Sequence, residues 1–139
     1  MVETTKHIAR ATVLGATGYA QDIQTGPHTL HADEHPKLGG TGIGPSPYQL
    51  LLASLGACTS ITLRMYAQRK GWERGEIHVD LKFYQGEGDP GGRIERSLRF
   101  EAELSSEQEQ LLFEIAWKSA VTKTLFASTS IHTEMSSSE

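Results

Sequence analysis

A long apolar helix over residues 46–71 constrains the fold of this chain more than any other feature. Ser46 can act as its N-cap, Pro47 suits the first helical position, Gln49 completes a capping box, and Gly71 provides a stop. Apolar residues occupy most of its circumference: Leu50, Leu51, Leu52, Leu55, Ile61, Leu63 and Met65. Such a helix is usually buried, so the rest of the chain must cover it.

Cys58 is the only cysteine and lies near the middle of this helix. A single cysteine excludes an intramolecular disulfide and a cysteine-rich zinc site. An inert core thiol is the simpler interpretation, because free cysteine is among the most buried residue types. The helix dipole fades beyond the first turn, so it gives Cys58 little activation. A reactive Cys58 therefore needs a cation from elsewhere in the fold or from a partner subunit.

The composition is that of a soluble protein with one domain over residues 1–139. The net charge of -4 at pH 7 and the lack of a Lys/Arg run argue against nucleic acid as a partner. Residues 1–10 lack the apolar segment of a signal peptide, and the longest apolar run is shorter than a membrane span. We therefore expect a cytoplasmic protein with no membrane partner, whose lone thiol stays reduced.

The order of the predicted elements indicates an α+β fold. A second helix is predicted over residues 105–126, with a capping box of Ser105 and Gln108. Alternating segments bounded by turns predict strands at residues 7–14, 19–25, 28–32, 77–85, 93–104 and 127–135. The strands are grouped and do not alternate with helices, which is typical of an α+β protein. One sheet cannot cover the apolar helix, so a homodimer with two helices wrapped by two sheets is expected.

Three further features point only weakly to a function. The loop 39–44 precedes the long helix, but it lacks the Lys-Ser/Thr ending of a phosphate loop, so a connector or active-site loop is the better interpretation. His28, His31 and His35 are close in sequence, yet the first two face opposite sides of a strand, which makes zinc ligation a minor hypothesis. Ser119 lies on the inner stripe of the second helix, where its hydroxyl can bond a carbonyl one turn earlier. No metal or other cofactor is predicted.

Several segments resemble the OsmC/Ohr superfamily. Residues 44–53 (GPSPYQLLLA) and 55–59 (LGACT) resemble its central helix, and residues 63–72 (LRMYAQRKGW) fit the same pattern. The resemblance covers nearly the whole chain, including the element order. It implies an OsmC-like intertwined homodimer, with two antiparallel sheets wrapped around two long central helices. It also implies thiol-dependent reduction of organic hydroperoxides at the dimer interface, in defence against oxidative stress.

The resemblance also assigns roles to individual residues. The family's peroxidatic thiol corresponds to Cys58, which would become a sulfenic acid. A second cysteine in the later helix resolves that acid in the family, and Ser119 occupies the matching position here. The family also holds its thiolate with an arginine tied to a glutamate, and Tyr48 stands where that glutamate would be, with Gln49 beside it. The candidate catalytic residues are therefore Cys58, Ser119, Gln49 and Tyr48.

Two functions remain open at this stage. The first is a one-cysteine peroxidase, in which a small thiol or dithiol reduces the sulfenic acid and Arg10, Arg64 or Arg69 supplies the cation. The second is a non-catalytic, dimeric binding protein, favoured by Ser119 in place of the resolving cysteine and by the loss of the family's arginine–glutamate pair. A mixed disulfide that regulates Cys58 is a weaker third idea. The peroxidase is the working prediction.

Overall fold

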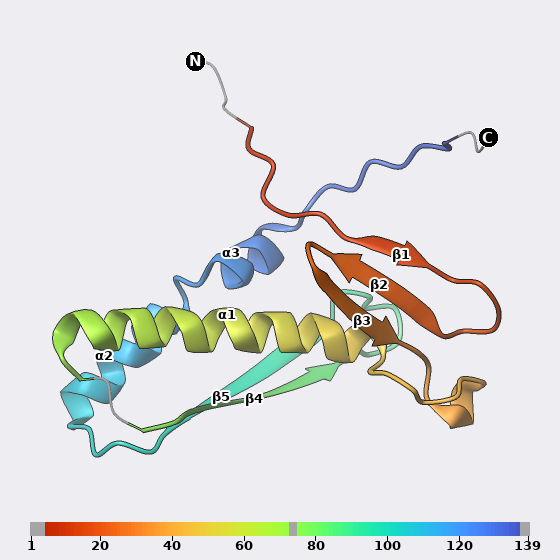
Figure 1. Cartoon of the computed structure of the whole chain (residues 1–139). Coiled ribbons are helices and arrows are strands. Elements are labelled where there is room, and N and C mark those ends of the chain that lie inside the picture. The colour runs from red at the N-terminus through yellow and green to blue at the C-terminus, as the bar shows by residue number, and fades with distance from the viewer. Residues whose placement is uncertain (1–4, 73–74, 137–139) are drawn as a thin grey trace. The chain divides into compact units, whose positions relative to one another are not determined.

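The computed structural model describes residues 5–72 and 75–136. The chain divides into two compact units, Met1–Leu51 and Leu52–Glu139. Figure 1 traces the order of the elements from β1 to α3. The strands fall in two separate antiparallel sheets and three α-helices accompany them, so the predicted α+β class is confirmed.

The first unit contains an antiparallel sheet in the order β1-β2-β3. Its strands are β1 (Thr12–Leu14), β2 (Gln21–Thr25) and β3 (His28–Ala32). The predicted first strand is therefore much shorter than residues 7–14. The pairing aligns Val13 with Ile23 and Ile23 with Leu30, which places one apolar row across the sheet. Val13 and Leu30 are exposed, so this row lacks a full cover within the chain.

The loop from β3 to α1 folds around Asp33, which is buried. A short 3-10 helix, η1 (Pro36–Leu38), forms within this loop. Gly40 passes so close to the carbonyl of Glu34 that a Cβ atom at Gly40 would collide with it. The glycines of this segment therefore serve a tight connection to the helix, which is one of the two interpretations left open above.

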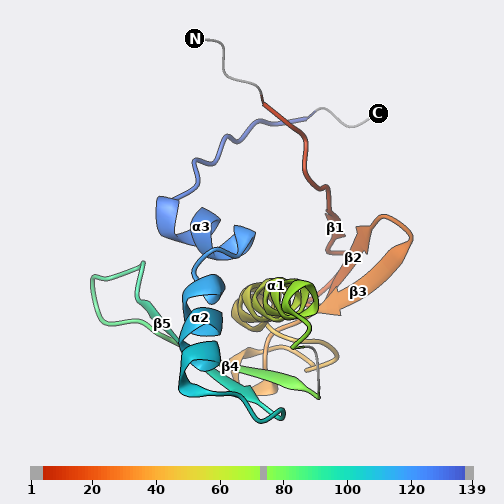
Figure 2. The same ribbon diagram turned by 90° about the vertical axis from the view of Figure 1, so that its left-hand side faces the viewer.

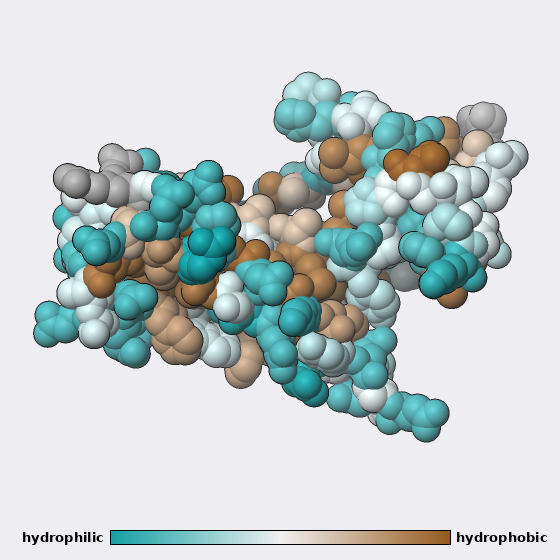
Figure 3. Space-filling view, turned by 90° about the horizontal axis from the view of Figure 1, so that it is seen from below, coloured by the Kyte–Doolittle hydropathy of each residue, from teal (hydrophilic) through white to brown (hydrophobic). Residues whose placement is uncertain are grey.

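Helix α1 (Pro47–Lys70) begins in the first unit and extends through the second, as predicted. Its buried residues lie on one stripe only: Leu55, Thr59, Leu63 and Ala67. Ile61 and Met65 are more than half exposed, so the burial expected all round the helix is only partly achieved within one chain. Apolar side chains also reach the surface among hydrophilic ones in the space-filling view (Figure 3).

By length and composition, α1 is also long and apolar enough to cross a membrane, with a mean hydropathy of 1.3. This differs from the expectation from uninterrupted apolar runs. The mean hydropathy stays high because small residues such as Ser54 and Thr59 lower it only slightly. The core helix of a soluble protein can have the same composition, so this property alone does not indicate a membrane protein.

The second unit packs α1 against a hairpin and a second helix. The hairpin consists of β4 (Ile77–Tyr84) and β5 (Arg93–Phe100), and the second helix is α2 (Ser106–Ala116). Figure 2 looks along α1, with α2 beside it and the hairpin below. The core contains Leu63, Leu112 and Ala116, covered by Tyr66, Ile77, Leu98, Phe100, Leu104 and Ile115. The alternating face predicted for the hairpin therefore supplies this core.

Two predictions for the C-terminal part of the chain are wrong. The helix predicted over 105–126 is broken, and α2 is followed by a separate helix, α3 (Ala120–Ala127). Ser119 caps α3 and competes with a continuous helix, because its side chain bonds the backbone of the next turn. The strand predicted over 127–135 is absent from the described residues. Ser128 adopts φ 62 after α3, and the residues that follow it up to 136 are irregular and exposed.

Candidate active site around Cys58

The sulfur of Cys58 meets the first turn of α3. Cys58 is partly buried on α1, and its Sγ accepts a hydrogen bond from the backbone N–H of Val121 at 3.5 Å. The first N–H groups of a helix have no partner within that helix, so Val121 has a donor to offer. The same helix end carries the positive pole of the α3 dipole, which favours a negative charge on the sulfur.

Ser119 organises this turn. Its side chain is fully buried, and Ser119 Oγ accepts a hydrogen bond from the N–H of Thr122 at 3.4 Å. Ser119 Oγ also bonds the hydroxyl of Thr122. The sequence predicts that Ser119 bonds a carbonyl one turn earlier in a continuous helix, and this is wrong, because Ser119 is instead the N-cap of α3.

Arg96 is the cation that lies in the Cys58 region. It sits on β5 opposite Leu81, on the same face as Leu98 and Ile94. Its Nη1 donates hydrogen bonds to Thr59 Oγ1 at 2.9 Å and to Thr122 Oγ1 at 2.8 Å. Its guanidinium also stacks over Trp117, at 5.8 Å from the ring centroid. Three elements, α1, β5 and the α2–α3 corner, therefore meet at this side chain.

The electrostatics link Arg96 to Cys58. Burial lowers the pKa of Arg96 from its ordinary value, and the negative charge of the Cys58 thiolate partly reverses this shift. Arginine keeps its proton in proteins, so the guanidinium carries a unit positive charge. The ion pairs found among residues 5–72 and 75–136 do not include Arg96. Against the effect of burial, the negative charge of Cys58 is what raises the pKa of Arg96.

The three arginines proposed from the sequence have other surroundings. Arg10 belongs to the first unit, where its carbonyl accepts a hydrogen bond from Thr25 Oγ1. Arg64 Nη2 donates to the carbonyl of Gly75 at 2.7 Å. Arg69 is exposed in the last turn of α1. Arg96 was not among the candidates, although a charged residue on the apolar face of the strand was the sequence signal that could have found it.

Tyr48 and Gln49 lie at the start of α1, in the first unit. Gln49 Oε1 accepts a hydrogen bond from the Ser46 N–H at 2.9 Å, and Ser46 Oγ accepts one from the Gln49 N–H at 3.3 Å. The predicted capping box is therefore confirmed. Its amide oxygen gives Gln49 a structural role at the helix end. Tyr48 has 53% of its surface exposed.

The histidines of the first unit are also dispersed. His31 Nδ1 lies 3.0 Å from Asp22 Oδ1, and His35 accepts a hydrogen bond from the backbone of Lys37 within the loop. Within the part of the chain that the structure describes, no group of three or more His, Cys, Asp or Glu residues could hold a metal ion. The zinc hypothesis therefore gains no support.

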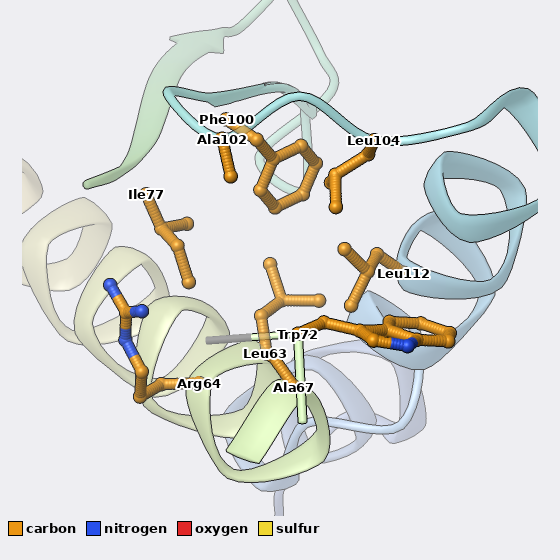
Figure 4. Close-up of a pocket in the computed structure, with 9 residues that line it drawn as sticks. All are labelled: Leu63, Arg64, Ala67, Trp72, Ile77, Phe100, Ala102, Leu104 and Leu112. Carbon is orange, nitrogen blue, oxygen red and sulfur yellow. The ribbon is translucent and has the colours of Figure 1, made fainter. Parts of the chain in front are cut away.

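A small apolar pocket opens elsewhere in the second unit, away from the residues that surround Cys58. Its volume is about 10 Å³, close to the space that a single water molecule needs. Figure 4 shows that aliphatic and aromatic side chains point into it from α1, α2 and the hairpin, with Arg64 at the side. The lining residues are Leu63, Arg64, Ala67, Trp72, Ile77, Phe100, Ala102, Leu104 and Leu112. This pocket is too small for an organic ligand.

Solved structures resemble this chain over most of its length. An OsmC-like protein from Mycoplasma pneumoniae is 16% identical, with a TM-score of 0.75, over 88% of this chain and 89% of that one. The organic hydroperoxide resistance protein OsmC from Legionella pneumophila is 18% identical, with a TM-score of 0.65, over 86% of this chain and 90% of that one. These two likenesses establish the fold.

A third structure is closer in sequence. The organic hydroperoxide resistance protein OhrB of Bacillus subtilis is 25% identical, with a TM-score of 0.58, over 84% of this chain and 89% of that one. Comparison of the sequence with curated proteins finds no match. The family model described as OsmC-like protein matches residues 39–135, which include α1, the hairpin and the Cys58 region. On these grounds, the chain belongs to the OsmC-like protein family.

Proposed function

We propose that this protein is a thiol-dependent peroxidase that reduces organic hydroperoxides through Cys58. The observation that carries the proposal is the electrostatic effect of Cys58 on Arg96, whose two hydrogen-bond partners are the neighbours in sequence of Cys58 and of Val121, and which has no carboxylate partner among residues 5–72 and 75–136. A neighbouring cation favours the thiolate, which is the nucleophilic form of cysteine. Membership of a family with hydroperoxide resistance proteins among its structural neighbours supports the same reaction.

The oxidative half of the reaction needs only Cys58 and the hydroperoxide. The thiolate sulfur attacks the terminal oxygen of the hydroperoxide, an S–O bond forms and the O–O bond breaks. The leaving alkoxide takes a proton and departs as an alcohol, and Cys58 is left as a sulfenic acid. Arg96 and the Val121 N–H stabilise the attacking thiolate through charge and hydrogen bonding.

The reductive half uses an external thiol, because Ser119 replaces the second cysteine. One thiol condenses with the sulfenic acid, which releases water and forms a mixed disulfide with Cys58. A second thiol attacks that disulfide, regenerates the Cys58 thiol and leaves as the oxidised disulfide. A dithiol carrier can supply both thiols. The reductant is therefore a small thiol or dithiol in a reducing compartment such as the cytoplasm.

A homodimer is part of this proposal, because two apolar surfaces lack a full cover within one chain. Ile61 and Met65 of α1 are exposed in the second unit, and Val13 and Leu30 are exposed in the first. Exposed apolar surface of this kind favours association with another subunit. Sedimentation analysis is expected to give twice the chain mass of 15.2 kDa, whereas a single-chain mass would contradict the dimer.

The test is steady-state consumption of tert-butyl hydroperoxide with dithiothreitol as the electron donor. The wild-type protein is expected to consume the hydroperoxide faster than the dithiol alone does. The variant Cys58→Ser, which keeps the size of the side chain and removes the thiol, is expected to fall to the background rate. Equal rates for the two proteins would reject the peroxidase and favour the non-catalytic binding protein.

A further inference from the structure

Two threonine hydroxyls accept the hydrogen bonds that Arg96 donates within residues 5–72 and 75–136. One belongs to Thr59, the residue after Cys58, and the other to Thr122, the residue after the N–H donor Val121. Thr59 has no exposed surface, and Thr122 is 9% exposed. Each threonine that bonds Arg96 therefore directly follows one partner of the hydrogen bond between Val121 and the Cys58 sulfur.

The hydroxyl protons of both threonines are directed away from Arg96. Thr59 Oγ1 donates to the carbonyl of Leu55 at 2.7 Å, one turn back in α1. Thr122 Oγ1 has two acceptors for its proton, Ser119 Oγ and the carbonyl of Ala116 at 3.5 Å. Each hydroxyl oxygen therefore presents its lone pairs to the guanidinium, and each threonine is satisfied as both donor and acceptor.

Neutral partners hold a cation without cancelling its charge. A carboxylate in the same place would form an ion pair with Arg96 and would offset the field that reaches the sulfur. A hydroxyl fixes the position of the guanidinium and leaves its unit charge for other anions nearby. Cys58 is the charge whose effect on the pKa of Arg96 opposes that of burial.

We propose that Thr59 and Thr122 are positioning residues, which hold Arg96 beside Cys58 through two neutral hydrogen bonds and so keep the thiol reactive. This inference rests on the proposed function, in which Cys58 is the nucleophile. Ser119 belongs to the same device, because its cap fixes the turn that carries both Val121 and Thr122. The serine at the position of the missing second cysteine thus supports the first cysteine.

The test is the rate at which iodoacetamide alkylates Cys58, measured by intact mass at neutral and at alkaline pH. Thr122→Val keeps the shape of the side chain and removes the hydroxyl, so Arg96 keeps one bond of two. We expect alkylation at neutral pH to slow by about 10-fold, the lower end of the effect of one hydrogen bond to a charged group. At alkaline pH the two rates should converge, because the thiol ionises without help. A purely structural role would not produce this pH dependence.

Two control variants separate the hydroxyl from other effects. Thr122→Ser keeps the hydroxyl and loses the methyl group, and it is expected to recover most of the lost rate. Thr124→Val makes the same change as Thr122→Val at an exposed position on the same helix, and it should alkylate like wild type. If Thr122→Val loses its native circular dichroism, Thr59→Val tests the other hydrogen bond with the same expected result.

The outcomes for this inference and for the peroxidase can be told apart. Wild-type alkylation rates at neutral pH in a folded Thr122→Val, or an equal loss in Thr122→Ser, would overturn the positioning role. Hydroperoxide consumption is measured on the same samples. One outcome would refute the peroxidase and leave the positioning role supported. In it, Cys58 is alkylated rapidly in the wild type and slowly in Thr122→Val, but the wild type consumes no hydroperoxide.

Discussion

Asp33 is a buried charged residue of the first unit, Arg96 is a partly buried one of the second, and both are held by neutral groups. The Asp33 carboxylate accepts hydrogen bonds from the N–H groups of Glu34, Thr41 and Ile43 and from the Thr41 hydroxyl at 2.6 Å. Arg96 donates to two threonine hydroxyls and stacks over Trp117. The two sites differ in how many hydrogen-bonding positions of the charged group are occupied.

The carboxylate of Asp33 is close to saturation. A carboxylate has about four acceptor sites, and the loop supplies donors for them. The hydroxyl of Thr41 is the first cause that lowers the pKa of Asp33 from 3.8 to about 2, and the backbone N–H bonds act in the same direction against the effect of burial. An anion that is fully bonded in this way holds a loop together and has little capacity left for a ligand.

Arg96 is far from saturation. A guanidinium has five N–H donors. The hydrogen bonds that Arg96 donates within residues 5–72 and 75–136 both use Nη1. The proposed function assigns the remaining donors and the unit charge to the thiolate and to an incoming hydroperoxide. The comparison indicates that a saturated charge stabilises the fold, whereas an unsaturated charge beside a nucleophile supports chemistry.

The largest effect should follow from removing the unsaturated charge. Arg96→Met keeps much of the apolar length of the side chain and removes the cation. We expect hydroperoxide consumption to fall by about 10- to 100-fold, because an opposite charge at close range changes the ionised fraction of its neighbour by this order. Arg96→Lys should recover part of the loss, since it keeps the charge without the planar fork. The measurement is kcat/KM for tert-butyl hydroperoxide.

Arg93→Met is the matched control for this variant. Arg93 lies on the same strand, is exposed, stacks over Tyr84 at 4.5 Å and pairs with Glu95. Its removal should leave kcat/KM at the wild-type value. A similar loss of kcat/KM in Arg93→Met and Arg96→Met would show that any cation on β5 matters equally and would contradict a special role for Arg96.

A smaller effect, on stability and not on chemistry, should follow from removing the saturated charge. Asp33→Asn is expected to lower the melting temperature at neutral pH, because an amide cannot accept all the hydrogen bonds of the loop. The native pKa of Asp33 lies below its unfolded value, so its contribution is complete above about pH 3.8 and is lost as the pH falls toward about 2. The wild-type and variant melting curves should therefore converge in acid.

Asp22→Asn is the control for this acid dependence. Asp22 is exposed and pairs with His31 at 3.0 Å, so its removal should leave the melting temperature nearly unchanged. Asp33→Asn should also leave Cys58 alkylation at the wild-type rate. Convergence in acid for Asp22→Asn, or none for Asp33→Asn, would be evidence against a saturated carboxylate at Asp33.

The smallest effect concerns the aromatic ring over Arg96. Trp117→Leu keeps an apolar side chain and removes the ring whose centroid lies 5.8 Å from the guanidinium. A cation–π contact at a partly exposed site is worth about 0.5–1 kcal/mol, or roughly a 2- to 5-fold slower alkylation of Cys58 at neutral pH. An unchanged rate would restrict the support of Arg96 to the two hydroxyls.

Much of the fold could be predicted from local patterns. The capping box of Ser46 and Gln49, the apolar residues of α1 and the alternation in the hairpin act over a few neighbouring residues, so their signals survive in the sequence. The helix predicted over 105–126 failed because the cap at Ser119 competes with a continuous helix. The apolar periodicity of residues 105–126 is the same whether or not Ser119 caps a new helix, so it could not predict the break.

The site was harder to predict than the fold. Cys58 and Ser119 were named from the sequence, but the hydrogen bond to Cys58 comes from Val121, 63 positions away in the chain. Arg96 is 37 residues from Thr59, and no local pattern specifies that pair. The alternation in β5 places Arg96 on its apolar face, but the sequence does not predict which residues lie beside that charge.

The most direct measurement of the central claim, that Arg96 supports Cys58 as the nucleophile, is the ultraviolet absorbance of the thiolate at neutral pH. Cys58→Ser supplies the baseline, since Cys58 is the only cysteine. Wild-type protein should show a thiolate signal above this baseline, and Arg96→Met should lose most of it, while Arg93→Met keeps it. An equal thiolate signal in wild type and in folded Arg96→Met would contradict the account.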